Sequence, residues 1–280
     1  MLILLALMSA LFTGGADFVG GLVSRRNSVV VVGLIAQTSG LLFLAPVLPL
    51  FSATDFPRTA IAGITAGVFG SLLVLLLYTG LAINNTIVAP LSAVIGAIIP
   101  TAYSLFAGQA LSCLNWIGIT LGLGAIVLLT APTSFRILDR RGILCGAGAG
   151  LLYGGFNLSL GCAGPSTGLW PLLMERLTIA TFLGAILLLR RSVVQWPKGW
   201  PLLLLLLGGA LDMAGNALFL GVAEHGVLPI VVLLISLYPG VTVFLGCKIL
   251  GERINRYQAG GACLAILSIV CTGLSAPRLH

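Results

Sequence analysis

The chain has 280 residues, of which 59% are hydrophobic and only 8% charged, and its formal net charge at pH 7 is +7. A soluble globular domain carries roughly 25% charged residues, so this chain lacks the polar surface that would keep it in water. The composition predicts an all-α integral membrane protein whose surroundings are the lipid bilayer. The basic residues fall mostly in short loops, which favours contact with lipid headgroups over nucleic-acid binding.

Ten apolar runs follow one another along the chain, separated by charged or Pro- and Gly-rich breaks. Each run has close to the ~20 residues that cross a ~30 Å hydrocarbon core as a helix. The runs are too continuously apolar for the alternation of a β-barrel, so each is expected to be a transmembrane helix. The predicted spans are 2–23, 29–51, 58–80, 86–107, 113–131, 142–162, 167–189, 200–222, 226–249 and 255–275.

An internal repeat divides the chain into two halves. Residues 11–17 (LFTGGAD) resemble residues 151–157 (LLYGGFN) at an offset of 140, and Pro100 matches Pro239 at an offset of 139. Each half then holds five helices. We therefore expect a first five-helix repeat over residues 1–131, a cytoplasmic connecting loop over 132–141 and a second repeat over 142–275.

The basic residues are distributed unevenly between the two sides of the membrane. Eleven of the 14 Lys and Arg residues lie in the odd-numbered loops, whereas the other side carries only Arg58 and Arg278. The odd loops are therefore expected to be cytoplasmic, with both termini on the non-cytoplasmic side of a cell (inner or plasma) membrane. Because five is odd, the second repeat would insert upside down relative to the first. Inverted repeats of this kind are characteristic of secondary transporters.

Several short motifs, in their order and duplication, carry a resemblance to a known family. Aromatic- and Gly-rich elements open each half, an aromatic-x-small-x-Ala element ends its third helix, and a Leu-Gly-Glu-Arg element follows the proline of the ninth span. In chain order they are 13–18 (TGGADF), 78–82 (YTGLA), 153–157 (YGGFN), 219–223 (FLGVA), Pro239, 250–253 (LGER) and 257–260 (YQAG). With these motifs the chain resembles the drug/metabolite transporter superfamily, specifically its ten-helix EamA-type members.

The resemblance covers essentially the full length and implies a small-molecule transporter. The first half departs from the family pattern, because residues 111–113 (LSC) stand where Leu-Gly-Glu is expected. The two halves therefore cannot be energetically equivalent.

Few polar side chains lie inside the predicted spans, and an ionisable group in lipid needs a partner or a wet cavity. We expect these side chains to line a central substrate cavity near the axis that relates the two halves. Asn157 aligns with Asp17, and Gln37 aligns roughly with Arg176. The expected lining is Asp17, Gln37, Tyr78, Tyr153, Asn157, Arg176, Asp212 and Asn216.

The charged side chains have alternative interpretations. Arg176 either binds an anionic substrate group or pairs with a carboxylate, unless it and Glu175 neutralise each other or snorkel. Adjacent helical residues point ~100° apart, so only one of these two is expected to face the cavity squarely. Because desolvation favours the neutral form of a carboxyl group, Asp17 and Asp212 are candidates to carry a coupling proton. The alternative is that both aspartates cap or bridge helices.

Four prolines fall within the fourth and ninth spans: Pro90, Pro100, Pro229 and Pro239. Proline removes a backbone donor and bends its helix, which frees carbonyl groups that can face a cavity or form a hinge. Structural kinking alone is the alternative reading of these residues.

The sequence thus predicts a secondary active transporter, an exporter of small metabolites, amino acids or drug-like compounds, that works by alternating access and is coupled to protons. A facilitative channel or exchanger is the first alternative, and a membrane-embedded lipid-processing enzyme is the second. The two His and seven Asp and Glu residues form no catalytic cluster, so no enzyme activity is expected. The six cysteines have no CxxC spacing, and no Walker A element is present, so no metal or cofactor is expected either. Both a monomer and a homodimer remain possible.

Overall fold

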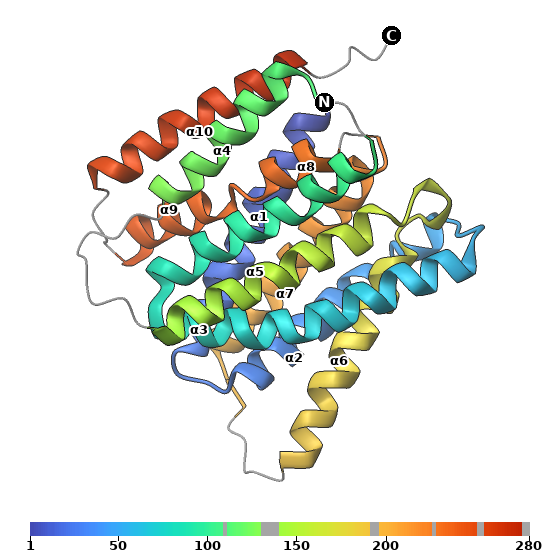
Figure 1. Ribbon diagram of the computed structural model, residues 1–280. Coiled ribbons are helices and arrows are strands. Elements are labelled where there is room, and N and C mark those ends of the chain that lie inside the picture. Colours follow the sequence, from blue (N-terminus) through green and yellow to red (C-terminus); the bar gives the residue numbers. More distant parts are fainter. Residues whose placement is uncertain (109–110, 130–139, 191–195, 226–227, 251–254, 276–280) are drawn as a thin grey trace.

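The computed structural model describes residues 1–108, 111–129, 140–190, 196–225, 228–250 and 255–275 (Figure 1). Within these residues it contains α-helices, two short 3-10 turns and no strand, which confirms the all-α prediction. The helices are α1 (Leu2–Ser24), α2 (Val29–Leu44), α3 (Phe56–Phe106), α4 (Cys113–Leu129), α5 (Arg140–Gly161), α6 (Trp170–Arg190), α7 (Trp200–Ala223), α8 (Leu228–Ile235), α9 (Tyr238–Leu250) and α10 (Arg256–Ser275). Residues 132–139 of the expected connecting loop of 132–141 lie outside the described residues. The last two residues of that loop, Arg140 and Arg141, are the first two of α5.

In the part of the chain that the structure describes, six helical segments are long and apolar enough to cross a bilayer, and there are shorter apolar helices as well. The long segments are Leu2–Ser24, Phe56–Leu81, Arg140–Gly161, Trp170–Leu189, Trp200–Ala223 and Leu228–Ile249. The shorter ones are Val29–Leu44, Leu91–Tyr103 and Cys113–Leu129. Large apolar side chains on the outer faces of the bundle, such as Leu42, Leu189 and Trp200, are 68% to 81% exposed. An apolar exterior of this kind is what lipid, rather than water, solvates.

α3 combines the predicted third and fourth spans in one helical element that folds back on itself (Figure 1). A straight helix of 51 residues would extend about 76 Å. A methyl group added to Gly80 would nevertheless lie 2.8 Å from Cγ1 of Val88, eight residues further on. α5 packs against both limbs, because its Gly155 meets Phe69 and its Gly154 meets Ile99. We call Phe56–Leu81 the first limb of α3 and Leu91–Tyr103 the second limb.

The predicted ninth span, 226–249, is divided into two helices. α8 ends at Ile235, and α9 begins at Tyr238, directly before Pro239. The Ser236 amide still donates to the Val232 carbonyl, whereas the Leu237 amide donates to Leu234 with the tighter 3-10 spacing. A proline cannot donate to the preceding turn, so the break at this point has a local cause.

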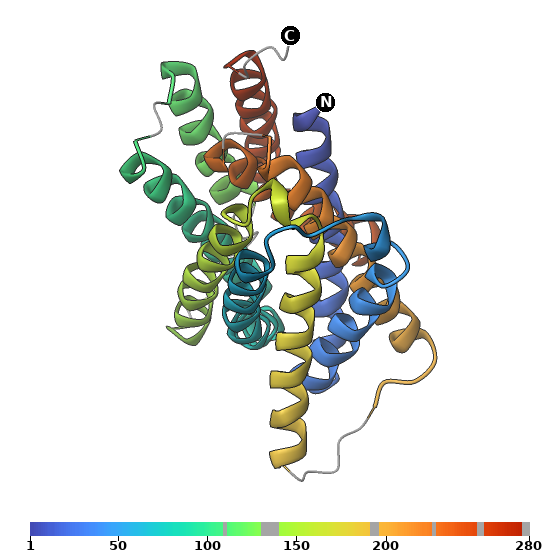
Figure 2. The ribbon, with the colours of Figure 1, turned by 90° about the vertical axis from the view of Figure 1, so that its right-hand side faces the viewer.

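The helices of the two halves pack across each other rather than forming separate bundles. α1 packs against α7 and α9, α5 packs against α3, and α2 packs against α6 and α7. α4 and α10 lie side by side at one edge of the molecule (Figures 1 and 2). The start of α1 and the end of α10 lie at the same end of the bundle, as an even number of crossings requires (Figure 1).

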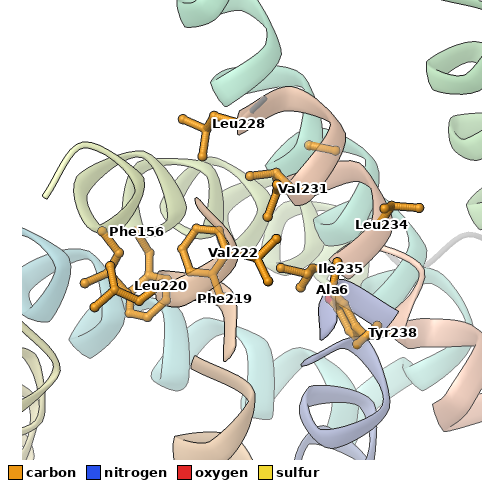
Figure 3. Close-up of a cluster of buried hydrophobic side chains, with 14 of the residues drawn as sticks. Ala6, Phe156, Phe219, Leu220, Val222, Leu228, Val231, Leu234, Ile235 and Tyr238 are labelled. Carbon is orange, nitrogen blue, oxygen red and sulfur yellow. The ribbon is translucent and has the colours of Figure 1, made fainter. Parts of the chain in front are cut away.

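The largest apolar core is formed where α7 and α8 meet α5 and α1 (Figure 3). Phe219 and Leu220 of α7 are at most 2% exposed, and they lie with Phe156 of α5 in the same cluster. Tyr238, at the start of α9, lies in this cluster close to Ala6 of α1 (Figure 3). The break between α8 and α9 is therefore packed inside the protein, where an irregular backbone is tolerated.

Candidate functional site

Residues of α1, α2, α3, α5, α6 and α7 line a small cavity that contains charged side chains. Seven of the eight residues expected at such a cavity line it: Asp17, Gln37, Tyr78, Tyr153, Arg176, Asp212 and Asn216. Its volume is about 50 Å³, which is room for a few water molecules only. The cavity is therefore contracted in this conformation and has to expand before it can hold an organic solute.

Arg176 of α6 is the centre of the polar network. Its Nη1 lies 2.8 Å from Oδ2 of Asp212 in α7 and also donates a hydrogen bond to Oε1 of Gln37 in α2. The arginine side chain is 1% exposed and that of Asp212 is 28% exposed. A buried guanidinium is stable only when its charge is paired, so this network joins α2, α6 and α7 at the cavity.

Glu175 lines the same cavity as Arg176, contrary to the expectation that only one of the two would face it. Its Oε2 lies 3.2 Å from Nε of Arg176, and both side chains are 1% exposed. The Cα–Cβ bonds of the two residues point ~100° apart, but the long arginine side chain bends toward Glu175 and brings its Nε close to the carboxylate. The contact has the distance of an ion pair without hydrogen-bond geometry, since neither atom has a hydrogen-bond partner in the described part of the chain.

Aromatic side chains form a second wall of the cavity. The phenol ring of Tyr78 packs directly on Gly20 of α1, where an added methyl group would lie 2.6 Å from the hydroxyl oxygen. Tyr153 stacks on Phe156, with ring centroids 6.4 Å apart, and meets the Tyr238 ring edge-on at 5.8 Å. Ring edges and faces at these distances hold the tyrosines in fixed orientations.

Asn157 is the expected lining residue that the structure places elsewhere. It is 3% exposed but does not line the cavity. Its Nδ2 has no hydrogen-bond partner among the described residues. Asp17, with which Asn157 aligns in the sequence, does line the cavity, so the aligned positions differ in their surroundings.

Several lining residues were not expected from the sequence. They are Thr13, Gly70, Leu73, Val74, Leu77, Phe156, Glu175 and Ile179. Part of this set follows from helical spacing, because residues three or four apart share a helix face. Thr13 precedes Asp17 by four positions, and Ile179 follows Arg176 by three. The apolar residues among them could not be singled out from the sequence, because most of the chain is apolar.

The four prolines have different surroundings. Pro100 lies within the second limb of α3, and Pro90 lies in α3 at a position whose side chain is outside the described part. Pro229 is the second residue of α8, where a missing amide proton breaks no helical hydrogen bond. Pro239 is the second residue of α9, directly after the break. Pro239 is thus the proline that coincides with an interrupted helix.

Two loops at one end of the bundle are tied together by hydrogen bonds, and we call this contact the loop latch. One loop precedes α3 and the other connects α5 to α6. The bonds run from the Thr54 amide to the Ser166 carbonyl (2.9 Å), from Arg58 Nη2 to the Cys162 carbonyl (3.0 Å) and from Trp170 Nε1 to the Phe51 carbonyl (2.7 Å). Each bond satisfies a carbonyl at a helix end or in a loop, so the latch holds the ends of α3, α5 and α6 in one position.

A second cavity of about 230 Å³ has an almost entirely apolar lining. It lies among the second limb of α3, α4 and α8, away from the charged network. Its lining is Ala97, Ile98, Thr101, Ala102, Leu105, Trp116, Ile119, Leu123 and Leu233. Neither cavity holds a metal-binding cluster, since no group of three His, Cys, Asp or Glu side chains comes together in the described ranges.

The apolar exterior, the crossing helices and the enclosed charged cavity together define a multi-pass α-helical membrane protein. Residues 140–274 match the EamA-like transporter family, part of the drug/metabolite transporter superfamily. Over these residues, slightly less than half of the chain, the protein is similar to a family of small-molecule membrane transporters. The resemblance drawn from the sequence motifs is thereby confirmed. Leu250 of the 250–253 motif ends α9, and the other three residues of the motif lie outside the described part of the chain.

A solved crystal structure of another protein is similar to the chain over nearly its whole length. The similarity covers 97% of this chain and 98% of the other, with a TM-score of 0.73 at 16% sequence identity. At that identity the comparison shows a shared fold and nothing about substrate. Among curated proteins the sequence has no match.

Proposed function

We propose that this protein is a secondary active transporter that exports small metabolites, amino acids or drug-like compounds by alternating access, coupled to protons. The observation that carries the proposal is the enclosed polar cavity, to which both halves of a lipid-embedded bundle contribute charged residues. Intramembrane charges are expensive, and in membrane proteins they mark substrate and ion pathways. A purely structural bundle would have no need of four ionisable side chains around one cavity.

Contacts at matching positions support the inverted repeat that alternating access requires. A methyl group added to Gly14 of α1 would lie 2.7 Å from Cβ of Val241 and against the carbonyl of Tyr238. At Gly154 of α5, 140 positions later, it would lie 2.7 Å from Cβ of Ile99. Ile99 precedes Tyr238 by 139 positions. Gly14 of the first half therefore contacts the residue of the second half that matches Ile99, and Gly154, which matches Gly14, contacts Ile99 itself.

A second pair of contacts follows a similar relation, with Gly67 and Gly209 142 positions apart. Gly67 of α3 lies against Thr178, and its added methyl group would be 3.0 Å from the carbonyl of Glu175. Gly209 of α7 lies against the carbonyl of Ala36 and against Ser39. Ala36 and Ser39 precede Glu175 and Thr178 by 139 positions each. Two halves packed in this exchanged way can swap conformations, which is the basis of alternating access in inverted-repeat carriers.

The loop latch and the contracted cavity are consistent with a carrier closed on one side. By the distribution of basic residues, the latch loops belong to the non-cytoplasmic face, together with both termini. An exporter has to open this latch to release its solute and close it again to accept the next. The protein would then reside in the inner or plasma membrane.

We propose that protons enter the cycle through Asp17 and Asp212. Both carboxyl groups line the cavity. In membrane proteins, Asp and Glu side chains inside the spanning helices serve as proton relays. Proton binding and release at this pair would link the cycle to a pH gradient.

Transport in proteoliposomes tests the proposal. Saturable counterflow, in which an internal unlabelled solute drives uptake of the same labelled solute, identifies a carrier. Flux that rises linearly with concentration would instead identify a channel. The repeat is tested by tag accessibility: the loop at 24–28 and the loop at 162–169 should lie on opposite faces. Finding both on the same face would contradict the inverted arrangement.

A further inference from the structure

Charge pairing within the cavity separates its ionisable groups into two sets. Three carboxyl groups (Asp17, Glu175 and Asp212) and one guanidinium (Arg176) line it. Arg176 is engaged with both Glu175 and Asp212, at 3.2 and 2.8 Å. Asp17 has no ion pair in the part of the chain that the structure describes. One guanidinium thus faces three carboxyl groups, and Asp17 is the carboxyl group that does not contact it.

This balance changes the role that Arg176 can have. A free guanidinium would attract an anionic substrate, but here two carboxylates already surround the arginine. An incoming anion would have to displace one of these two carboxyl groups from the arginine, with a third carboxyl group nearby in the same cavity. The electrostatics therefore favour a cation, because an opposite charge stabilises the ionised carboxylates in a space with little water.

The rest of the lining has features that an organic ammonium ion needs. Tyr78, Tyr153 and Phe156 line the same cavity, and aromatic rings contact both the cationic head and the apolar body of such ions. One donor also remains: Nη2 of Arg176 is buried and has no hydrogen-bond partner among the described residues. A buried donor without a partner is unfavourable, so a neutral acceptor on the solute would be favourable there.

We propose that the cavity binds a small aromatic ammonium ion, with its amine against the Asp17 carboxylate and a neutral acceptor against Arg176. This inference rests on the proposed transport function and names its substrate class. The solute enters only after the cavity has expanded from its present 50 Å³. Asp17 is the binding carboxylate because it is free, whereas Asp212 stays with the arginine.

Four probes of similar shape and different charge test this assignment on the purified full-length protein. Tyramine is a cation with a phenol oxygen as acceptor, and phenethylamine is the same cation without it. Tyrosine is the zwitterion, and 3-(4-hydroxyphenyl)propionate is the anion. We expect tyramine to raise the midpoint of thermal unfolding saturably. Phenethylamine should bind more weakly, and the anion should have no effect.

The matched variants are Asp17→Asn and Glu224→Gln. Asp17→Asn should lower tyramine affinity at least about tenfold, since a charge-assisted hydrogen bond contributes ~1.5–3 kcal/mol. Glu224 is a partly buried carboxyl that follows α7 outside the cavity, so its variant should bind tyramine as the unmodified protein does. If Asp17→Asn does not fold, the comparison of the four probes on the unmodified protein still tests whether the cavity binds the cation.

The outcomes separate the substrate class from the transport function. Saturable exchange of the anion or of tyrosine, with no effect of tyramine, would overturn the cation assignment and leave the carrier intact. No effect of tyramine in either assay would also overturn it. Unsaturable flux of all four probes would instead refute the carrier mechanism itself.

Discussion

Arg176 of α6 donates a hydrogen bond from Nη1 to Oε1 of Gln37 in α2, and the two residues are 139 positions apart. The same offset relates Pro100 to Pro239. In the inverted repeat that we propose, residues at matching positions of the two halves can meet directly only near the axis that relates the halves. The contact therefore marks the place where a small rotation of one half against the other would act first on the polar network.

Removing the positive charge at this contact should destabilise the protein strongly. Arg176→Gln leaves the buried Glu175 and the partly exposed Asp212 without their cation, and breaking a fully buried pair costs ~3–5 kcal/mol. We expect a lower midpoint of thermal unfolding, followed by tryptophan fluorescence in detergent. The combined variant Arg176→Met, Glu175→Gln and Asp212→Asn removes all three charges and should recover most of the loss. An unchanged midpoint for Arg176→Gln alone would mean that the network does not stabilise the fold.

Proton coupling is tested by Asp212→Asn. An amide cannot exchange a proton, so uptake driven by a pH gradient should be abolished. Exchange of labelled for unlabelled solute should continue at a reduced rate, because it needs no net proton movement. The measurement is uptake into proteoliposomes with and without an imposed gradient. Gradient-driven uptake at the original rate would remove Asp212 from the coupling role and leave Asp17.

Close helix packing predicts opposite effects at two glycines of α7. Gly209→Ala would place a methyl group against Ser39 and the carbonyl of Ala36, and such overpacking costs ~1–3 kcal/mol. At Gly221 nothing in the described part lies within 4 Å of the added carbon. Gly221→Ala should therefore be neutral or stabilise the helix by about 1 kcal/mol. Thermal unfolding of both variants checks this, and a similar loss for both would contradict the packing argument.

The loop latch predicts which segments open when it is weakened. Trp170→Phe removes the indole donor to Phe51, and Arg58→Ala removes the guanidinium from the Cys162 carbonyl. Amide hydrogen exchange in residues 51–58 and 162–169 should rise several-fold in either variant, because both loops lose a shared restraint. Trp200→Phe is the matched control, since its ring is 68% exposed at the start of α7. Equal exchange in all three variants would show that the loops are not held by these bonds.

Hydropathy predicted the crossings well because lipid leaves the backbone no alternative to a helix. The third and fourth spans fall on the two limbs of α3, and the ninth falls on α8 and α9. The sequence could not show that helical hydrogen bonding persists around the bend of α3. That depends on how tightly Gly80 and Val88 approach, which is a property of tertiary packing.

The site was predictable where polar residues stand out against an apolar background. Asp17, Gln37, Arg176 and Asp212 were found in this way, and all four line the cavity. Asn157 is also a rare polar residue in an apolar helix, but it does not line the cavity. The rarity of a polar residue does not predict which way its side chain points. The role of Glu175 was underestimated from helix geometry alone, which neglects how far an arginine side chain can bend.

The uninterrupted bend of α3 has a mechanical consequence. The two limbs of α3 belong to one helical element without a linker between them, so we expect the two limbs to move together. The corresponding segments of the second half are α7 and α8–α9. α7 ends at Ala223, and a second break separates α8 from α9 at Ser236. In the transport cycle that we propose, we expect the second half to bend at these two breaks while the two limbs of α3 keep their relative position.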